Sequence, residues 1–252
     1  MTTLDARRRL IIRRIRITGW TALTSLLVTV VSFLTWFHIV FTAERDATLE
    51  VFRDDRVQVT EVEGSIVMEA AEGTGTTGIL YFPGARVDPY SYLYPLSEIA
   101  ASGVTVVIMD PLMNMALFDT RTVEELALAA PEVNDWILSG HSLGGVRACM
   151  LAQHPDVVGL VLMGSYCATD VSALSIPVLQ VLGSGDGLID TEAVSASASF
   201  LPDSARTIVL EGVNHASFGT YGAQPGDGIA TLSRAEVREE LTTMFRKLLA
   251  GD

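Results

Sequence analysis

The sequence predicts an α/β fold, in which a mostly parallel sheet has helices on both faces, lacks a large cap domain and follows one transmembrane helix. Two patterns carry this prediction. Beyond residue 57, short apolar runs rich in β-branched residues alternate with stretches of helical periodicity, as in parallel sheets covered by helices. Before residue 44, a long uncharged run follows a cluster of arginines, as in membrane-spanning helices.

The strands are expected where apolar residues form unbroken runs. Residues 57–62 and 65–69 flank Gly64 and are expected to pair in antiparallel fashion. The later strands are expected at 78–82, 104–109, 136–139, 157–163, 178–182 and 207–210. The intervening helices are expected near 90–101, 123–130, 143–153, 192–200 and 233–249. Composition does not shift between residues 57 and 252, so this stretch is interpreted as one domain.

The N-terminal segment is interpreted as a membrane anchor. Six arginines and one aspartate precede Ile17, and no charged residue occurs from there to Ala43. Trp20 to Phe41 alone spans 22 residues, about 33 Å as a helix, which matches a hydrocarbon core of about 30 Å. A cleaved signal peptide is the alternative, but its apolar region is normally only about 7–15 residues long.

Charge asymmetry sets the expected topology, because arginines flanking a membrane helix stay in the cytoplasm. Residues 1–43 carry a net charge of +5, which leaves −18 on the rest of the chain. So acidic a domain argues against nucleic-acid binding. The expected segments are an Arg-rich cytoplasmic N-terminus (1–16), a single-pass transmembrane helix (17–43), a polar tether (44–56) and an extracytoplasmic domain (57–252).

The two cysteines, Cys149 and Cys167, would face an oxidising compartment on this topology. Cys149 falls inside a predicted helix, and Cys167 follows the next predicted strand. We expect two free, partly buried thiols in preference to a disulfide.

A candidate nucleophile lies between a predicted strand and a predicted helix. The run Gly140-His141-Ser142-Leu143-Gly144 fits G-x-S-x-G, the signature of a nucleophile elbow, and the strand-to-helix context is the one the signature needs. Its glycines permit a tight turn and a close approach of helix to strand. Ser142 is therefore interpreted as a nucleophile, which requires a base within hydrogen-bond reach.

Elimination among four histidines indicates the base. His38 lies in the membrane segment, His141 adjoins the serine and is expected to fill a structural role, and His154 closes a helix. His215 directly follows the last predicted strand, at the edge of the sheet where ligands bind.

The third member of a triad orients the imidazole and stabilises its charged form. Asp186 follows the strand that ends at Leu182 and lies in a glycine-rich loop, so it is the candidate acid. Asp190 is the rival but is expected to cap the next helix, and Asp170 is a more distant alternative. The resulting chain order is Ser, Asp, His.

An oxyanion hole requires two backbone N–H donors. One is expected from Leu143, directly after the nucleophile. The other is expected from the loop "YFPGARVDP", where Ala85 is favoured and Gly84 or Arg86 are alternatives.

Together, the segments "YFPGARVDPYSYLYPL", "GHSLGG", "GSGDGL" and "NHASFGTYGAQPGDG" resemble the α/β-hydrolase superfamily, over roughly residues 57–250. More narrowly, they resemble its small, capless bacterial members related to dienelactone hydrolases. The resemblance implies Ser142 as nucleophile, Asp186 as acid, His215 as base, and hydrolysis of esters or related acyl bonds. Dienelactone hydrolases use a cysteine nucleophile where this sequence has Ser142. The 14 residues between the strands at 157–163 and 178–182 are too few for a helical lid.

These observations predict a membrane-anchored, carboxylesterase-like serine hydrolase that forms an acyl-enzyme on Ser142 from a small-molecule or lipid-like acyl substrate. An acyltransferase with the same triad and a catalytically silent surface binding protein are the alternatives. No cofactor is implied, no Cys or His cluster has metal-ligand spacing, and no oligomeric state is indicated.

Overall fold

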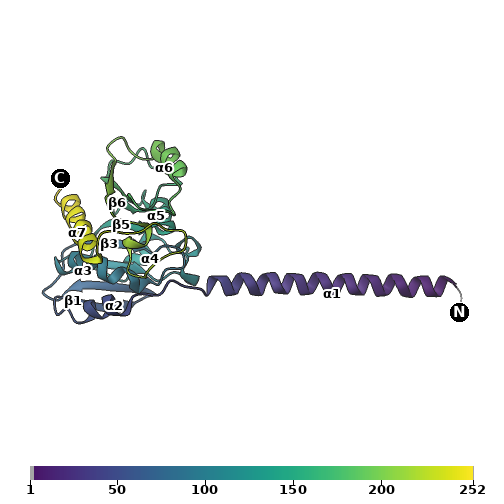
Figure 1. Ribbon diagram of the computed structural model, residues 1–252. Helices are drawn as coiled ribbons and strands as arrows, with labels where there is room; N and C mark the ends of the chain where they lie inside the picture. The colour runs from purple at the N-terminus through teal and green to yellow at the C-terminus, as the bar shows by residue number, and fades with distance from the viewer. Residues whose placement is uncertain (1–2, 252) are drawn as a thin grey trace. The chain divides into compact units, whose positions relative to one another are not determined.

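The computed structural model describes residues 3–251, and the chain divides into two compact units at Ile39 and Val40. Residues 1, 2 and 252, the extreme ends of the predicted N-terminal segment and of the predicted domain, lie outside the described residues. The first unit holds helix α1, Thr3–Phe37 (Figure 1). Within it, Arg7–Trp36 is long and apolar enough to cross a membrane, and this stretch is not buried inside the structure.

The second unit is built on an eight-stranded sheet (Figure 1). The first two strands and the pair β2–β4 are antiparallel, and every other neighbouring pair is parallel. The order across the sheet is β1-β2-β4-β3-β5-β6-β7-β8. The strands are β1 Val57–Val62, β2 Ser65–Ala70, β3 Thr77–Phe82, β4 Thr105–Met109, β5 Asp135–His141, β6 Val157–Met163, β7 Val178–Gly183 and β8 Arg206–Leu210.

Helices cover both faces of this sheet. The α-helices are α2 Arg45–Phe52, α3 Leu93–Ala101, α4 Val123–Ala127, α5 Leu143–Leu151, α6 Thr191–Ser197 and α7 Arg234–Ala250. Short 3-10 helices are η1 Pro89–Tyr92, η2 Leu112–Asn114, η3 Ala116–Phe118, η4 Ala198–Phe200 and η5 His215–Phe218. The predicted mostly parallel sheet flanked by helices is therefore confirmed.

Side-chain alternation along the strands makes two separate cores. Because successive residues of a strand point to opposite faces, Ile79 and Tyr81 pack with α2, α3 and α7, whereas Leu80 and Phe82 pack with α4 and α5. All four side chains are at most 1% exposed. Both faces of the central strands are thus buried, which explains their nearly continuous apolar sequence.

The expectation of a polar tether at 44–56 is wrong. Residues 45–52 form α2, whose Ala47 and Val51 are 0% and 2% exposed and pack into the core. The two residues are one turn apart, so they form a short apolar stripe on a helix that also carries Arg45, Asp46 and Glu50. Two buried residues change the composition of residues 44–56 very little, which is why the sequence predicts a polar segment there. The backbone N–H of Glu44 also donates to the carbonyl of Thr220, at 2.7 Å.

The expectation of free thiols is also wrong, because Cys149 and Cys167 form a disulfide and both residues are 0% exposed. Cys149 lies on α5, and Cys167 lies just past the end of β6, with 5.5 Å between their Cα atoms. The crossover from β5 through α5 to the adjacent β6 brings them together, although they are 18 positions apart in sequence. Residues 164–177 form no helix, so the predicted absence of a lid there is confirmed.

Removal of the disulfide is expected to lower stability without changing the fold. Closing a loop of this length contributes about 3 kcal/mol by restricting the unfolded chain. A Cys149→Ala, Cys167→Ala double variant should therefore lose about that much free energy of unfolding, measured by denaturant titration under oxidising conditions. A reductant should destabilise the native chain but leave the double variant unchanged. Equal stability of the two proteins under oxidising conditions would contradict the bond.

Candidate active site

Ser142 lies on a strained turn between β5 and α5. Its φ of 54° and ψ of −128° are unusual for a residue with a side chain, and such strain persists only where the surroundings enforce it. A Cβ atom on Gly140 would lie 2.5 Å from the carbonyl carbon of Gly144. A Cβ atom on Gly144 would lie 2.0 Å from the carbonyl oxygen of Phe82. The two glycines therefore allow the turn and place the end of β3 against the start of α5.

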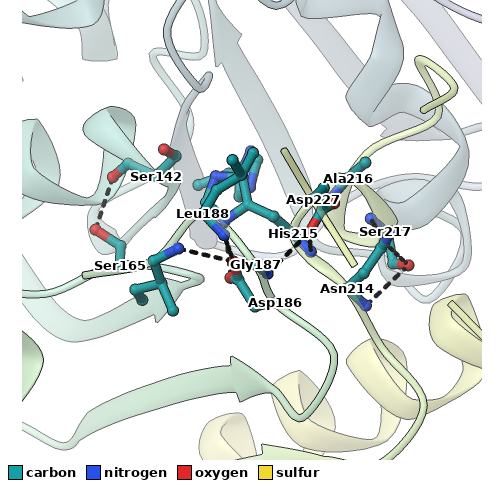
Figure 2. Close-up of polar contacts among 12 residues, drawn as sticks. Ser142, Ser165, Asp186, Gly187, Leu188, Asn214, His215, Ala216, Ser217 and Asp227 are labelled. Atoms are coloured by element: carbon teal, nitrogen blue, oxygen red, sulfur yellow. Dashed lines mark hydrogen bonds and ion pairs between the residues drawn. The ribbon is translucent and has the colours of Figure 1, made fainter. Parts of the chain in front are cut away.

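The predicted acid and base are hydrogen-bonded. His215 Nδ1 lies 2.8 Å from Asp186 Oδ2, and the two side chains are 5% and 0% exposed (Figure 2). Asp186 follows β7 and His215 opens η5 after β8, so adjacent parallel strands bring them together. Gly164 packs against the pair, since a Cβ atom there would lie 3.2 Å from both Asp186 Oδ2 and His215 Nδ1.

Asp186 is held in its charged form. Burial acts to raise the pKa of its carboxyl group, but the hydrogen bond and charge of His215 lower it. The backbone N–H groups of Leu188 and Ile189 also donate to Asp186 Oδ1, each at 2.9 Å. Together these contacts outweigh burial, so the pKa lies below its ordinary value of 3.8. An ionised Asp186 fixes a proton on His215 Nδ1 and leaves Nε2 to accept one.

Ser142 and His215 border one small cavity of about 140 Å³. Ser165 supports the turn from below, since its hydroxyl donates to the carbonyl of Ser142 at 2.7 Å (Figure 2). Among the described residues, the Ser142 hydroxyl makes no hydrogen bond to His215; such contacts are often long until a ligand binds. The lining residues are Ser142, Leu143, Val146, Gly164, Ser165, Tyr166, Leu188, Ile189, Asp190 and His215.

The structure narrows the candidates for the second oxyanion donor. The N–H of Gly84 donates to Tyr92 Oη at 2.9 Å, and the N–H of Arg86 donates to the carbonyl of Asn114 at 2.7 Å. Within residues 3–251, the N–H of Ala85 makes no hydrogen bond, so it alone of the three is available to an oxyanion. Leu143 is the first residue of α5, where backbone N–H groups lack an intrahelical partner.

The sequence predicts a structural role for His141, and the structure shows which residues it contacts. Tyr92 Oη accepts from the N–H of Gly84 at 2.9 Å and is also hydrogen-bonded to His141 Nδ1, at 2.9 Å. The His141 ring is 1% exposed, and its centroid is 4.5 Å from that of His215. Burial lowers the pKa of His141 well below 6.5, and the nearby charge of His215 lowers it further. A neutral His141 therefore contacts the loop of Gly84 through Tyr92 and packs against the ring of His215.

Asp227 was missed by sequence reasoning, although it lies in the quoted segment "NHASFGTYGAQPGDG". Its Oδ1 accepts from the backbone N–H groups of Gly187 and His215, both at 3.1 Å. Its Oδ2 accepts from the N–H of Ala216 at 2.8 Å (Figure 2). One carboxylate thereby fixes the loop that carries Asp186 to the loop that carries His215. The only signal in the sequence is its place between two glycines, which does not specify a partner.

The rival residues have other contacts. Asp190 borders the cavity but caps α6, accepting from the N–H groups of Glu192 and Ala193 at 3.0 Å. Asp170 accepts from Ser172, and His154 Nε2 lies 2.6 Å from Glu124. In the part of the chain that the structure describes, no group of three or more His, Cys, Asp or Glu side chains is arranged to hold a metal ion.

Comparisons with known proteins agree with this architecture. A family model described as the alpha/beta hydrolase family matches residues 78–239. The crystal structure of a predicted CIB-like hydrolase from Thermoplasma acidophilum is similar, with a TM-score of 0.51 and 18% sequence identity. That match covers 76% of this chain and 97% of the other. A search of curated proteins gives no match. The predicted α/β-hydrolase fold is thus confirmed.

The depressed pKa of His141 is expected to make the protein less stable in mild acid. Below about pH 6.5 the unfolded chain takes up a proton that the folded protein does not, so stability falls as pH falls, by up to about 1.4 kcal/mol per pH unit from this group. His141→Asn keeps a side chain that can hydrogen-bond to Tyr92 Oη, and it cannot titrate. Denaturant titrations between about pH 7 and 5 should give a shallower decline for the variant. An unchanged slope would show that His141 titrates normally.

Loss of the Asp227 carboxylate is expected to misplace His215. In Asp227→Asn, an amide group would replace one of the two acceptor oxygens that hold backbone N–H groups. Displacement of His215 should lower the rate at which a phosphonate modifies Ser142 by about 10²-fold. Asp203→Asn, a change at an exposed aspartate remote from the cavity, is the control and should react at the native rate. Native reactivity of folded Asp227→Asn would refute the positioning role.

Proposed function

Because the chain belongs to the alpha/beta hydrolase family, we propose that it is a membrane-anchored serine hydrolase that cleaves carboxylic esters or related acyl bonds. The proposal is carried by one arrangement: Ser142 on a strained turn borders the same cavity as His215, whose other nitrogen is bonded to an ionised Asp186. A serine, a base and an orienting acid in this order are the parts that acyl transfer needs.

In the proposed reaction, the Ser142 hydroxyl attacks the carbonyl carbon of the substrate while His215 Nε2 takes its proton. The carbonyl oxygen becomes an oxyanion, which the N–H groups of Leu143 and Ala85 stabilise. His215 then gives its proton to the leaving alkoxide, and the acyl group stays on Ser142. Water, deprotonated by His215, attacks the acyl-enzyme, and collapse of the second oxyanion releases the acid and restores the serine.

The size of the site favours a modest acyl group. The cavity of about 140 Å³ is smaller than the roughly 300–1,000 Å³ of sites that enclose drug-sized ligands. No helix lies between β6 and β7 to close over it. Substrates whose acyl group is short, or unbranched next to the scissile bond, fit this cavity best.

Two observations support an extracytoplasmic domain on a single anchor. The uncharged part of α1, which begins at Ile17, follows the arginine cluster, and this order favours a cytoplasmic N-terminus. The Cys149–Cys167 bond is of the kind that persists in oxidising compartments.

Covalent labelling of the full chain by a fluorophosphonate tests the proposal. The native protein should be labelled on Ser142, as mapped by mass spectrometry, and Ser142→Ala should not be labelled. His215→Ala and Asp186→Asn should react more slowly, by up to about 10⁴-fold, since they remove the base or its orienting partner. Ser165→Ala changes the other serine bordering the cavity, and its label should still map to Ser142. A folded native protein that takes no label would refute the proposal.

A further inference from the structure

The domain begins beside the oxyanion loop. Phe41 forms an isolated parallel bridge with Val87. Its N–H donates to the carbonyl of Arg86 at 2.7 Å, and its carbonyl accepts from the N–H of Asp88 at 3.0 Å. The N–H of Ala43 donates to Asp88 Oδ2 at 3.3 Å. The first residues of the second unit are therefore fixed to the segment that directly follows Ala85, at the edge of the sheet that holds Ser142.

Exposed apolar side chains lie at the same edge. The N–H of Arg86 donates to the carbonyl of Asn114, which closes η2 after the carboxyl end of β4. On either side of Asn114, Leu112 is 70% exposed and Leu117 is 37% exposed. A continuous set of backbone contacts thus connects Phe41, the oxyanion loop and this apolar segment.

Few residues connect α1 to the segment fixed at this edge. The expectation of a transmembrane helix over 17–43 is wrong at its C-terminal end, because α1 ends at Phe37 and residues 40–43 belong to the second unit. Four residue steps separate Phe37 from Phe41, and extended backbone covers at most about 3.5 Å per step, or about 14 Å in all. With residues 44–56 folded onto the domain, no tether is available to lengthen this connection.

We propose that the edge of the sheet that bears Ser142 contacts the surface of a lipid bilayer through Leu112 and Leu117. The inference rests on the proposed membrane anchoring and deepens the proposed function, since it assigns the substrate to esters held by the bilayer. Burial of two leucine side chains in the interface adds favourable transfer energy to an attachment that α1 already provides.

The charge of this edge indicates which kind of bilayer it contacts. Glu61, Asp88 and Asp110 surround a cavity of about 380 Å³ at this same edge. Carboxylates there would be repelled by an anionic lipid surface. The partner that the edge fits is therefore a zwitterionic surface, such as that of phosphatidylcholine.

The test places a fluorescent probe on the full chain in phosphatidylcholine vesicles that contain a spin-labelled quencher lipid. The native cysteines of the described chain are both in the disulfide, so Leu117→Cys introduces a thiol that can be labelled specifically. Val158→Cys is the matched control, because Val158 is also 37% exposed but lies at the start of β6, on the opposite edge. The probe at 117 should lose most of its fluorescence, and the probe at 158 should keep it.

The possible results distinguish failure of the bilayer contact from failure of the membrane anchoring. A chain that floats with the vesicles and shows equal quenching at both positions, or none at 117, overturns the inference and leaves the anchoring intact. A chain that does not float overturns both. Fluorophosphonate labelling of each variant confirms that its active site is folded.

Turnover provides a second measurement. Leu112→Asp combined with Leu117→Asp should slow hydrolysis of the acetate ester of a long-chain alcohol carried in phosphatidylcholine vesicles, and leave hydrolysis of a water-soluble acetate ester unchanged. Equal rates of both reactions in the variant and the native chain would overturn the inference.

Discussion

The close contact between the turn at Ser142 and the end of β3 is the constraint on which the site depends. Gly144 allows the carbonyl oxygen of Phe82 to occupy space that any side chain would fill, and Gly140 allows the helix to turn back over its strand. This packing forces Ser142 to a positive φ and presents its hydroxyl at the edge of the sheet. It also places the carbonyl oxygen of Pro83, two residues before Ala85, against Gly144. One steric arrangement therefore fixes Ser142 and the start of the loop that carries the proposed donor Ala85.

Periodicity and strand ends explain how much of the site is predictable from sequence. The strands around Ser142 are buried on both faces, so their apolar runs are unbroken and their ends are well marked. Parallel strands carry their ligands at one edge, which makes Ser142, Asp186 and His215 neighbours once the strands are placed. The structure brings Asp186 and His215 into hydrogen-bond contact and puts Ser142 and His215 on one cavity.

Features that depend on single contacts cannot be predicted from periodicity and strand ends. The buried stripe on α2 consists of only Ala47 and Val51, so the composition of this segment predicts a polar tether. The bond between Cys149 and Cys167 depends on a distance across a crossover that spacing does not reveal. Asp227 acts on backbone N–H groups, which have no signature in the sequences of the loops that it joins.

The most direct test of the central claim is a crystal structure of the phosphonate adduct. The account predicts a covalent bond from phosphorus to Ser142 Oγ, with the phosphonyl oxygen about 2.7–3.1 Å from the backbone nitrogens of both Leu143 and Ala85. It also predicts His215 Nε2 within hydrogen-bond distance of Ser142 Oγ or of the alkoxy oxygen of the phosphonate. An adduct on another residue, or a phosphonyl oxygen that contacts neither amide, would contradict the account.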